Sequence, residues 1–337
     1  MKDSESEPTM NLRQKPKKFT TILVAGEGES SYKVYHQHKA FLKIDGKSII
    51  TYVVETLQQV ESIKDIYIVG LKEKLQQTLK EANINLQYPK PIYFVEQKSN
   101  LYENIWSSFL KTLPNEGNIP DLENSIYKDT PVLIVPCDAP LITPEEVEYF
   151  VKNCDLESYD YTLGLVSEKK LEYFYPRENH SGVKMAYLHI KEGSYRINNL
   201  HLVKPLRILN RQYIKDMYQY RYQRDIKNII LFGLKLFGKD RLEKFKYYFG
   251  LEACLLFSSL GKESMVNFFR NWTQKKEIEQ CISRIMKTRF MGLEVPFPGA
   301  ALDIDNNQDY ETIKSRFREW REHLSHRPYP LRSESAV

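Results

Sequence analysis

Cysteine is scarce in this sequence, and long apolar runs are missing altogether. No two of the four cysteines have the spacing of a zinc site or a redox motif. The four are Cys137, Cys154, Cys254 and Cys281. We therefore expect buried, reduced thiols and a cytoplasmic protein. No apolar run approaches the roughly 18 residues of a membrane-spanning helix. Residues 1–8 are polar and acidic and lack the apolar centre of a signal peptide.

A strong excess of charge of either sign is also missing. The chain has 49 lysines and arginines against 44 aspartates and glutamates, a net charge of +5. This excess is too small to require a nucleic-acid partner, and the 23 tyrosines are scattered rather than grouped in an RNA-binding motif. We therefore expect no nucleic acid among the partners. A chain of 337 residues suits either one large domain with an insertion or two domains.

What the sequence does contain, from residue 19 to about residue 166, is a regular alternation of apolar and amphipathic segments. Segments typical of strands lie at 20–25, 65–69, 92–95, 131–136 and 159–165. Segments typical of helices lie at 48–60, 73–82, 101–113 and 144–151. This order predicts an α/β domain with a mainly parallel sheet flanked by helices. Such sheets bind ligands beyond the carboxyl ends of their strands.

The pattern changes after residue 166. A short strand is expected at 183–190, and a polar turn at 196–202 leads into another strand. From 205 to about 272 the pattern is helical and aromatic-rich, and then a strand is expected at 279–287 and an amphipathic helix at 309–323. We divide the chain into a disordered tail at 1–18, the first part of the α/β domain at 19–204, a helical insertion at 205–290, the closing segment of the α/β domain at 291–325 and a flexible tail at 326–337.

Basic residues are concentrated in the insertion. Residues 204–246 contain twelve Lys or Arg against four Asp or Glu. Such a run is usually a solvated helix face, but an anionic lipid surface or an anionic substrate would also bind it. The apolar segments 229–232 and 255–257 are too short to span a bilayer, so peripheral membrane contact stays open as an interpretation.

Two glycines follow the first expected strand, in the segment Ala25-Gly26-Glu27-Gly28, and Lys39 comes shortly after them. Small residues let backbone N–H groups approach a phosphate closely, and a lysine can neutralise its charge. A glycine at this place is also compatible with a plain turn. This pattern alone leaves both a phosphate-binding loop and a simple turn open.

Acidic residues follow later strands. Asp138 comes just after the expected strand 131–136, and Thr143 is placed to cap the next helix. Asp303 and Asp305 are two residues apart, so in an extended segment their side chains point to the same face. Each of these acids could instead have only a local structural role, accepting hydrogen bonds from backbone N–H groups in a turn or at the start of a helix. Together they could hold Mg²⁺, which prefers one or two carboxylates plus substrate phosphates.

These motifs, in this order, resemble the nucleotidyltransferases of the molybdenum-cofactor guanylyltransferase-like (MobA-like) family. Members open with a strand, a Gly-x-Gly loop and a lysine, and this opening matches Gly26, Gly28 and Lys39. The Asp-x-Pro motif of the family matches Asp138-Ala139-Pro140, and its closing Asp-x-Asp matches Asp303-Ile304-Asp305. The resemblance implies a Rossmann-like fold of the nucleotide-diphospho-sugar transferase type, also called glycosyltransferase-A-like. The sequence pattern adds the helical insertion to this fold.

The resemblance also implies an activity and a set of site residues. The implied enzyme depends on Mg²⁺ and moves a nucleoside monophosphate from a nucleoside triphosphate to a phosphorylated or hydroxyl acceptor, small or lipid-linked, releasing pyrophosphate. The residues implied in catalysis are Lys39 and Asp138. Those implied in nucleotide binding are Ala25, Gly26, Gly28, Lys39 and Asn104. Those implied in metal binding are Asp138 and Asp305, with Asp303 as the less favoured ligand.

The chain departs from the family after the second glycine. Many relatives carry Thr or Ser and then Arg there, whereas this sequence has Glu29 and Ser30. An arginine would contact the triphosphate in a bidentate manner, and Lys33 can supply only a point charge instead. Two alternatives stay open: a glycosyltransferase of the same fold that uses a nucleotide sugar, and a catalytically degenerate nucleotide-binding or membrane-associated scaffold.

Overall fold

The computed structural model describes residues 18–26, 34–178, 180–215 and 241–325, with side chains described from residue 249 in the last range. In this part of the chain, eight strands form one sheet, and β2 (Lys43–Ile44) pairs with β3 (Lys47–Ser48) in a separate small sheet. Almost all of the tails expected at 1–18 and 326–337 lies outside the described residues, as do Gly28, Glu29, Ser30 and Lys33.

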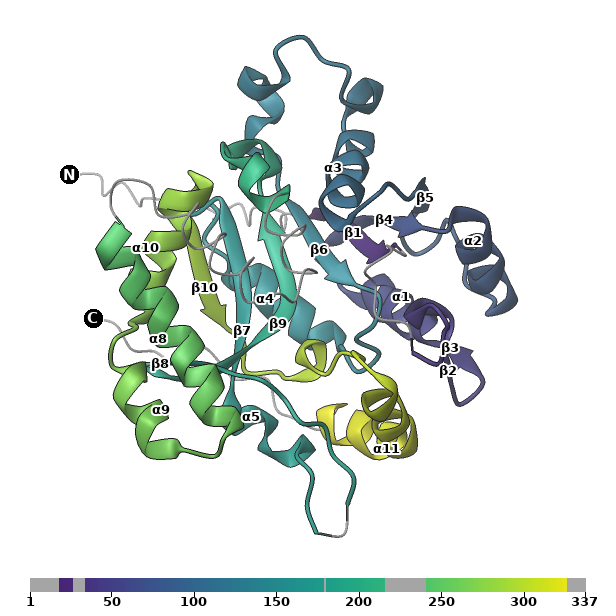
Figure 1. The fold of residues 1–337 in the computed structure, drawn as a ribbon. Helices are drawn as coiled ribbons and strands as arrows, with labels where there is room; N and C mark the ends of the chain where they lie inside the picture. The colour runs from purple at the N-terminus through teal and green to yellow at the C-terminus, as the bar shows by residue number, and fades with distance from the viewer. Residues whose placement is uncertain (1–17, 27–33, 179, 216–240, 326–337) are drawn as a thin grey trace, which may run out of the picture.

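The large sheet has the strand order β10-β7-β9-β6-β1-β4-β5, and β8 pairs with β9 (Figure 1). The strands are β1 (Phe19–Ala25), β4 (Ile63–Gly70), β5 (Ile92–Glu96), β6 (Val132–Pro136), β7 (Tyr161–Ser167), β8 (Leu188–Ile190), β9 (Gly193–Val203) and β10 (Phe290–Glu294). Within this order β9 runs antiparallel to both of its neighbours, and the other neighbouring pairs are parallel. The predicted mainly parallel, mixed sheet is confirmed.

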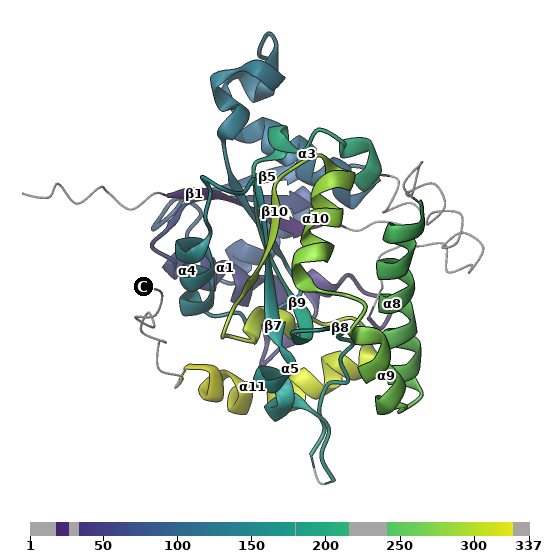
Figure 2. The same ribbon diagram turned by 90° about the vertical axis from the view of Figure 1, so that its left-hand side faces the viewer.

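Helices cover both faces of this sheet. Those of the α/β domain are α1 (Ile49–Gln59), α2 (Lys72–Glu81), α3 (Leu101–Thr112), α4 (Pro144–Asn153), α5 (Glu168–Leu171) and α11 (Asn307–Ser325). Leu23 of β1 belongs to a core with α1, α4 and α11, whereas its neighbour Ile22 belongs to a core with α3 and α10 (Lys275–Met286). Successive strand residues point to opposite faces, so the sheet separates two hydrophobic layers. Figure 2 shows α1 and α4 on one side of the sheet and α10 on the other.

Polar caps start the helices that follow β5 and β6. The Asn100 side chain accepts a hydrogen bond from the Glu103 N–H at 2.9 Å, and α3 begins there. The Thr143 side chain accepts one from the Glu146 N–H at 3.2 Å, so the expected N-cap of α4 is confirmed. Each cap satisfies a backbone N–H that the helix itself leaves without a partner. Both helices therefore begin at defined points near the carboxyl ends of these strands.

The strand expected at 279–287 is wrong, because most of this segment lies in α10. Ile282 and Met286 are four residues apart, which is one helical turn, and both pack in the core on the α3 side of the sheet. The strand of this region is β10, which starts at Phe290. Of the strand expected at 183–190, only residues 188–190 form a strand, which is β8.

Two helices of the insertion, α8 (Arg241–Ser259) and α9 (Glu263–Arg270), lie beyond α10 on the same side of the sheet (Figure 2). Within the described ranges, no helix combines the length and apolarity needed to cross a membrane. The boundaries proposed for the tails, the domain and the insertion stay a prediction.

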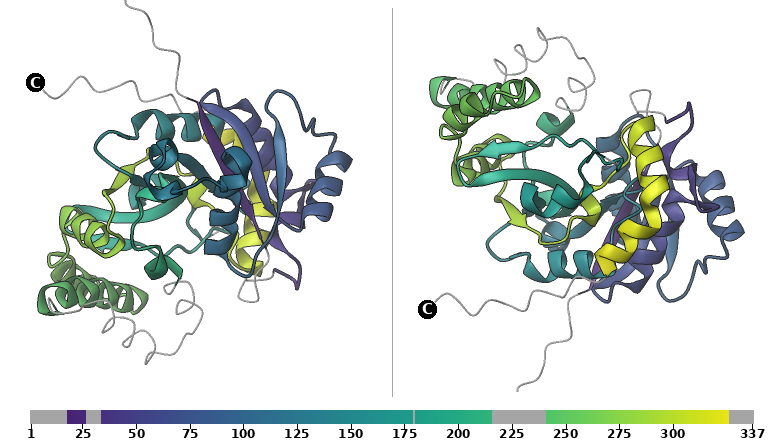
Figure 3. Two further views of the ribbon diagram at one scale, coloured as in Figure 1. Left: turned by 90° about the horizontal axis from the view of Figure 1, so that it is seen from above. Right: turned by 90° about the horizontal axis from the view of Figure 1, so that it is seen from below.

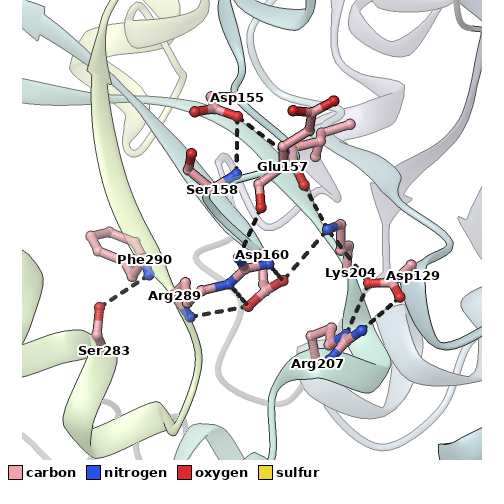
Figure 4. A network of polar contacts seen from close by, with 11 residues as sticks. Asp129, Asp155, Glu157, Ser158, Asp160, Lys204, Arg207, Ser283, Arg289 and Phe290 are labelled. Carbon is pink, nitrogen blue, oxygen red and sulfur yellow. Dashed lines mark hydrogen bonds and ion pairs between the residues drawn. The ribbon is translucent and has the colours of Figure 1, made fainter.

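A network of ion pairs joins the two ends of the insertion to the amino end of β7 (Figure 4). The Arg289 guanidinium donates to both carboxylate oxygens of Asp160, at 2.6 and 2.8 Å. The buried Lys204 ammonium lies 3.5 Å from both Asp160 and Asp129, and Arg207 donates to Asp129 at 2.6 and 2.9 Å. These contacts lie at the edge of the sheet opposite the carboxyl ends of the parallel strands, so they support the fold rather than a site there.

Ion pairs within the molecule also involve the first part of the basic run at 204–246. All four basic residues between 204 and 215 form ion pairs with acids of the α/β domain. Besides Lys204 and Arg207, these pairs are Arg211 with Glu123 and Lys215 with Glu103. This part of the run is therefore neutralised within the molecule. The side chains of its remaining basic residues lie outside the described ones.

Candidate functional site

The loop after β1 begins at Ala25 and Gly26, at the carboxyl edge of the sheet. Ala25 is buried. A Cβ atom added to Gly26 would overlap Nδ2 of Asn104, so only glycine fits against this amide without a shift. The structure thus places Gly26, next to Ala25 in the chain, against Asn104, and nucleotide binding by these residues stays a prediction. Gly28 lies outside the described residues.

Asn104 occupies the first turns of α3 and is buried. Its side-chain oxygen accepts a hydrogen bond from the Lys98 N–H, in the loop after β5. Its backbone oxygen accepts from the Ser108 hydroxyl at 2.7 Å. Asn104 therefore joins the loop after β5 to the loop after β1 and holds its amide at a defined place.

Asp138 lies just beyond β6, next to β1 in the sheet. The Cys137 N–H donates to the Val24 oxygen at 3.0 Å and extends the pairing of the two strands to this point. The Asp138 backbone oxygen accepts from the Ile304 N–H at 3.0 Å. This bond brings the segment that carries Asp303 and Asp305 against the end of β6, although more than 160 residues separate the two in sequence.

Lys39 links the two acidic segments. It begins the short 3-10 helix η1 (Lys39–Phe41), which is capped by the His38 side chain. Its Nζ atom lies 2.9 Å from Oδ2 of Asp138 and 3.3 Å from Oδ1 of Asp305. Burial opposes the charged form of Lys39, but the neighbouring carboxylates outweigh it and raise the pKa above its ordinary value. Lys39 therefore carries its charge at neutral pH.

Asp303 and Asp305 lie just before the start of α11, which crosses the molecule below the sheet (Figure 3, right). The Asp305 N–H donates to Oδ2 of Asp309 at 3.2 Å, and Asn306 donates to the same atom at 2.8 Å. The Tyr35 N–H donates to Oδ1 of Asn307 at 2.9 Å. The first turn of α11 thus holds the acidic segment next to the part of the chain that leads to Lys39.

The three carboxylates form one cluster that fits a divalent cation. One oxygen each of Asp138, Asp303 and Asp305 lies within 4.8 Å of the others. Burial and the two neighbouring carboxylates raise the pKa of Asp303 to about 6, against the opposing effect of Arg196. Like charges held this close disfavour ionisation unless a cation compensates them. Hard oxygen donors in a cluster of this size are the ligands that Mg²⁺ takes in proteins.

Arg196 belongs to this site, although no motif in the sequence points to it. It lies on β9, donates to the Ala301 oxygen at 2.9 Å and to Oδ1 of Asp303 at 2.8 Å. Burial opposes its charged form, but Asp303 outweighs this effect and raises the pKa of the guanidinium. The segment around Arg196 was expected to be a polar turn. Only the antiparallel pairing of β9 brings its amino end to the carboxyl edge of β6 and β7.

The chain is similar to several known proteins. Residues 20–232 match the family model of the MobA-like NTP transferase domain. A hypothetical transferase from Thermus thermophilus has a similar solved structure, with a TM-score of 0.55, 20% sequence identity, and coverage of 87% of this chain and 99% of that one. No match was found among curated proteins.

Two further solved structures are more distant. One is a 4-diphosphocytidyl-2C-methyl-D-erythritol synthase from Anaerococcus prevotii, with a TM-score of 0.41, 11% identity, and coverage of 90% of this chain and 97% of that one. The other is a CMP:2-keto-3-deoxy-manno-octonic acid synthetase complexed with CTP, with a TM-score of 0.42, 11% identity, and coverage of 89% and 99%.

The family match covers more than half of the chain and includes the loop after β1, Lys39, Asn104 and Asp138. It ends before Asp303 and Asp305, which the fold brings to the same place. The chain belongs to the family of MobA-like NTP transferase domains, which are transferases of the nucleotidyl type.

Proposed function

We propose that this protein is a Mg²⁺-dependent nucleotidyltransferase that moves a nucleoside monophosphate from a nucleoside triphosphate to a phosphorylated or hydroxyl acceptor and releases pyrophosphate. One observation carries this proposal. Lys39, Asp138 and Asp305 meet at the edge of the sheet where Gly26 lies against Asn104. A lysine ammonium, a carboxylate cluster and a glycine backbone at one edge of the sheet suit a triphosphate better than an uncharged ligand.

In this proposal Asp138 and Asp305 would hold Mg²⁺, which would neutralise charge on phosphate oxygens. Gly26 leaves room for the nucleotide to approach the backbone, and Asn104 presents its amide beside it. Lys39 sits on a flexible stem and carries its charge at neutral pH, so its ammonium can turn from the carboxylates to a phosphate. Lys39 directly, and Asp138 and Asp305 through Mg²⁺, would therefore neutralise the negative charge of the triphosphate.

The reaction is a displacement at the α-phosphorus. An oxygen of the acceptor forms a bond to this phosphorus, and the bond from it to the bridging oxygen of the β-phosphate breaks. Pyrophosphate leaves with the electron pair. An acceptor that is already a phosphate anion needs no general base, whereas a hydroxyl acceptor would release its proton to solvent water as the new P–O bond forms. Lys39 stabilises the negative charge in the transition state.

Two other functions are compatible with parts of the site. A glycosyltransferase of this fold would use a nucleotide sugar, but this chain has Asp138-Ala139-Pro140 after its central strand rather than an Asp-x-Asp pair. A nucleotide-binding scaffold is favoured by Glu29 and Ser30, where relatives carry an arginine-bearing loop. Pyrophosphate release separates these functions, since only nucleotidyl transfer produces it.

The test is a screen of the four nucleoside triphosphates, with and without Mg²⁺, against a panel of sugar and polyol phosphates. We expect Mg²⁺-dependent pyrophosphate release with at least one combination. Asp138→Asn should abolish it while the thermal unfolding temperature stays close to that of the wild type. Release at the wild-type rate by this variant would contradict the proposed metal ligand. Mg²⁺-dependent binding of nucleotide sugars alone would favour the glycosyltransferase.

We further propose that the insertion contacts an anionic membrane surface, from which a lipid-linked acceptor would be reached. Five large apolar side chains on α8, α9 and the turn between them are exposed. They are Phe249, Leu255, Leu256, Leu260 and Phe268. Helical faces that combine exposed apolar residues with basic neighbours in sequence are typical of interfacial binding.

A further inference from the structure

The three carboxylates of the cluster are not equivalent. Asp303 pairs with Arg196, and 15% of its side chain is exposed. Asp305 pairs with Lys39, and 54% of its side chain is exposed. Asp138 also pairs with Lys39. Asp138 is about as shielded as Asp303, with 17% of its side chain exposed, so the two acids differ in their partners rather than in their accessibility.

Arg196 is held more firmly than Lys39. Its guanidinium binds a side chain and a backbone oxygen at once, Oδ1 of Asp303 and the oxygen of Ala301. A planar guanidinium presents donors in a fixed fork, whereas an ammonium on a four-carbon stem turns freely. A phosphate or a cation that arrives can therefore displace Lys39 from its carboxylates more easily than Arg196 from Asp303.

The loop in front of Asp303 is anchored independently of Arg196. The Asn199 amide donates to the Ala300 oxygen at 3.2 Å, and the Ala300 N–H donates to Oε2 of the buried Glu146 at 2.9 Å. These bonds hold η7 (Gly299–Ala301) to β9 and α4. Removal of the Arg196 side chain alone would therefore free the carboxylate of Asp303 while the loop stays in place.

We propose that Arg196 is a positioning residue that keeps Asp303 out of the coordination sphere of the metal, so that the cation binds Asp138 and Asp305 only. Asp303 and Arg196 together form a neutral pair, and the two remaining carboxylates match the one or two that Mg²⁺ uses beside substrate phosphates. This inference rests on the metal site of the proposed function. It adds which carboxylates bind the metal and what prevents the third from doing so.

The experiment measures binding of Mn²⁺, as the probe metal, to the full chain without nucleotide, by electron paramagnetic resonance of the free ion. At a pH above the pKa that Asp303 has without its arginine partner, Arg196→Gln should tighten Mn²⁺ binding about tenfold, because a third carboxylate becomes available. The double variant Arg196→Gln with Asp303→Asn should bind Mn²⁺ within about threefold of the wild type, because it removes only the neutral pair. Asp305→Asn should weaken binding at least about tenfold.

A matched control tests whether the loss of any arginine ion pair changes Mn²⁺ binding. A second double variant serves if the first does not fold. Arg207→Gln also removes an arginine from an ion pair, with Asp129 at the opposite edge, and should leave Mn²⁺ binding unchanged. If the first double variant unfolds, Arg196→Met with Asp303→Leu replaces the pair by apolar groups of similar size.

Two results would overturn the inference. Asp303 would be a ligand if the double variant lost as much Mn²⁺ affinity as Asp305→Asn. Arg196 would be merely structural if Arg196→Gln failed to tighten binding. A wild-type protein that bound no Mn²⁺ would instead refute the metal site of the proposed function, and the inference with it.

Discussion

Lys39 Nζ lies 2.9 Å from Oδ2 of Asp138, and 99 residues separate the two in the chain. The contact joins the segment after β1 to the end of β6, and the same ammonium reaches Asp305 at 3.3 Å. Three distant parts of the sequence therefore meet at one cation.

Lys39→Met should lower the rate of pyrophosphate release at least about 100-fold, because the variant lacks a cation for the transition-state charge. The unpaired carboxylates should also repel one another, so added Mg²⁺ should raise the unfolding temperature of the variant more than that of the wild type. Lys47→Met is the control, since Lys47 pairs with Glu55 at 2.7 Å away from the acidic cluster. Equal losses in both variants would speak against a specific role for Lys39.

Gly26→Ala should lower the free energy of unfolding by about 1–3 kcal/mol, because the added methyl group overlaps Nδ2 of Asn104. Urea denaturation measures this change. Combining it with Asn104→Ala should cost clearly less than the sum of the two single changes, since the overlapping amide is then gone. Strict additivity would show that the two residues are not in contact. Nucleotide binding, measured by calorimetry, should weaken in each variant.

Asp160→Asn should lower the free energy of unfolding at pH 7 by about 2 kcal/mol, a value kept small because half of the Arg289 side chain is exposed. Burial opposes ionisation of Asp160, but Arg289 outweighs it and lowers the pKa of this carboxyl in the folded protein. The stabilisation is therefore complete above the unfolded-state pKa of about 3.9. It is lost as the pH falls through the lower folded-state pKa.

The measurement for Asp160 is urea denaturation of both proteins between pH 7 and pH 3. The difference between wild type and Asp160→Asn should stay constant down to about pH 5 and shrink below about pH 4. A difference that grew as the pH fell would contradict the assignment.

Leu256→Asp should reduce flotation of the protein with vesicles that contain phosphatidylserine, because a charge then replaces one of the exposed apolar side chains of α8. Ile126→Asp is the matched control: Ile126 is also exposed but belongs to the 3-10 helix Ile126–Asp129 of the α/β domain. If the wild-type protein does not float with these vesicles, the proposed membrane contact is refuted. Equal losses in both variants would also speak against a surface on α8.

Local patterns in the sequence determined much of the fold. Apolar segments of strand length separated by amphipathic segments predicted β1, β4, β5, β6, β7 and the helices between them, because side-chain period and turn chemistry act over a few residues. The same local rules placed Asp138 beyond a strand and Thr143 at a helix cap. Short apolar runs are ambiguous, so the pattern of 279–287 predicts a strand although the segment is largely helical.

Only the tertiary structure decided how these pieces form a site. The antiparallel course of β9 between β6 and β7 brings Arg196 to Asp303, 107 residues away. Nothing near Arg196 in the sequence indicates this partner, because strand order depends on packing among all the strands. The motifs thus specify which residues carry charge and where strands end. The packing of the sheet determines which carboxylates meet Lys39 and which one Arg196 keeps apart.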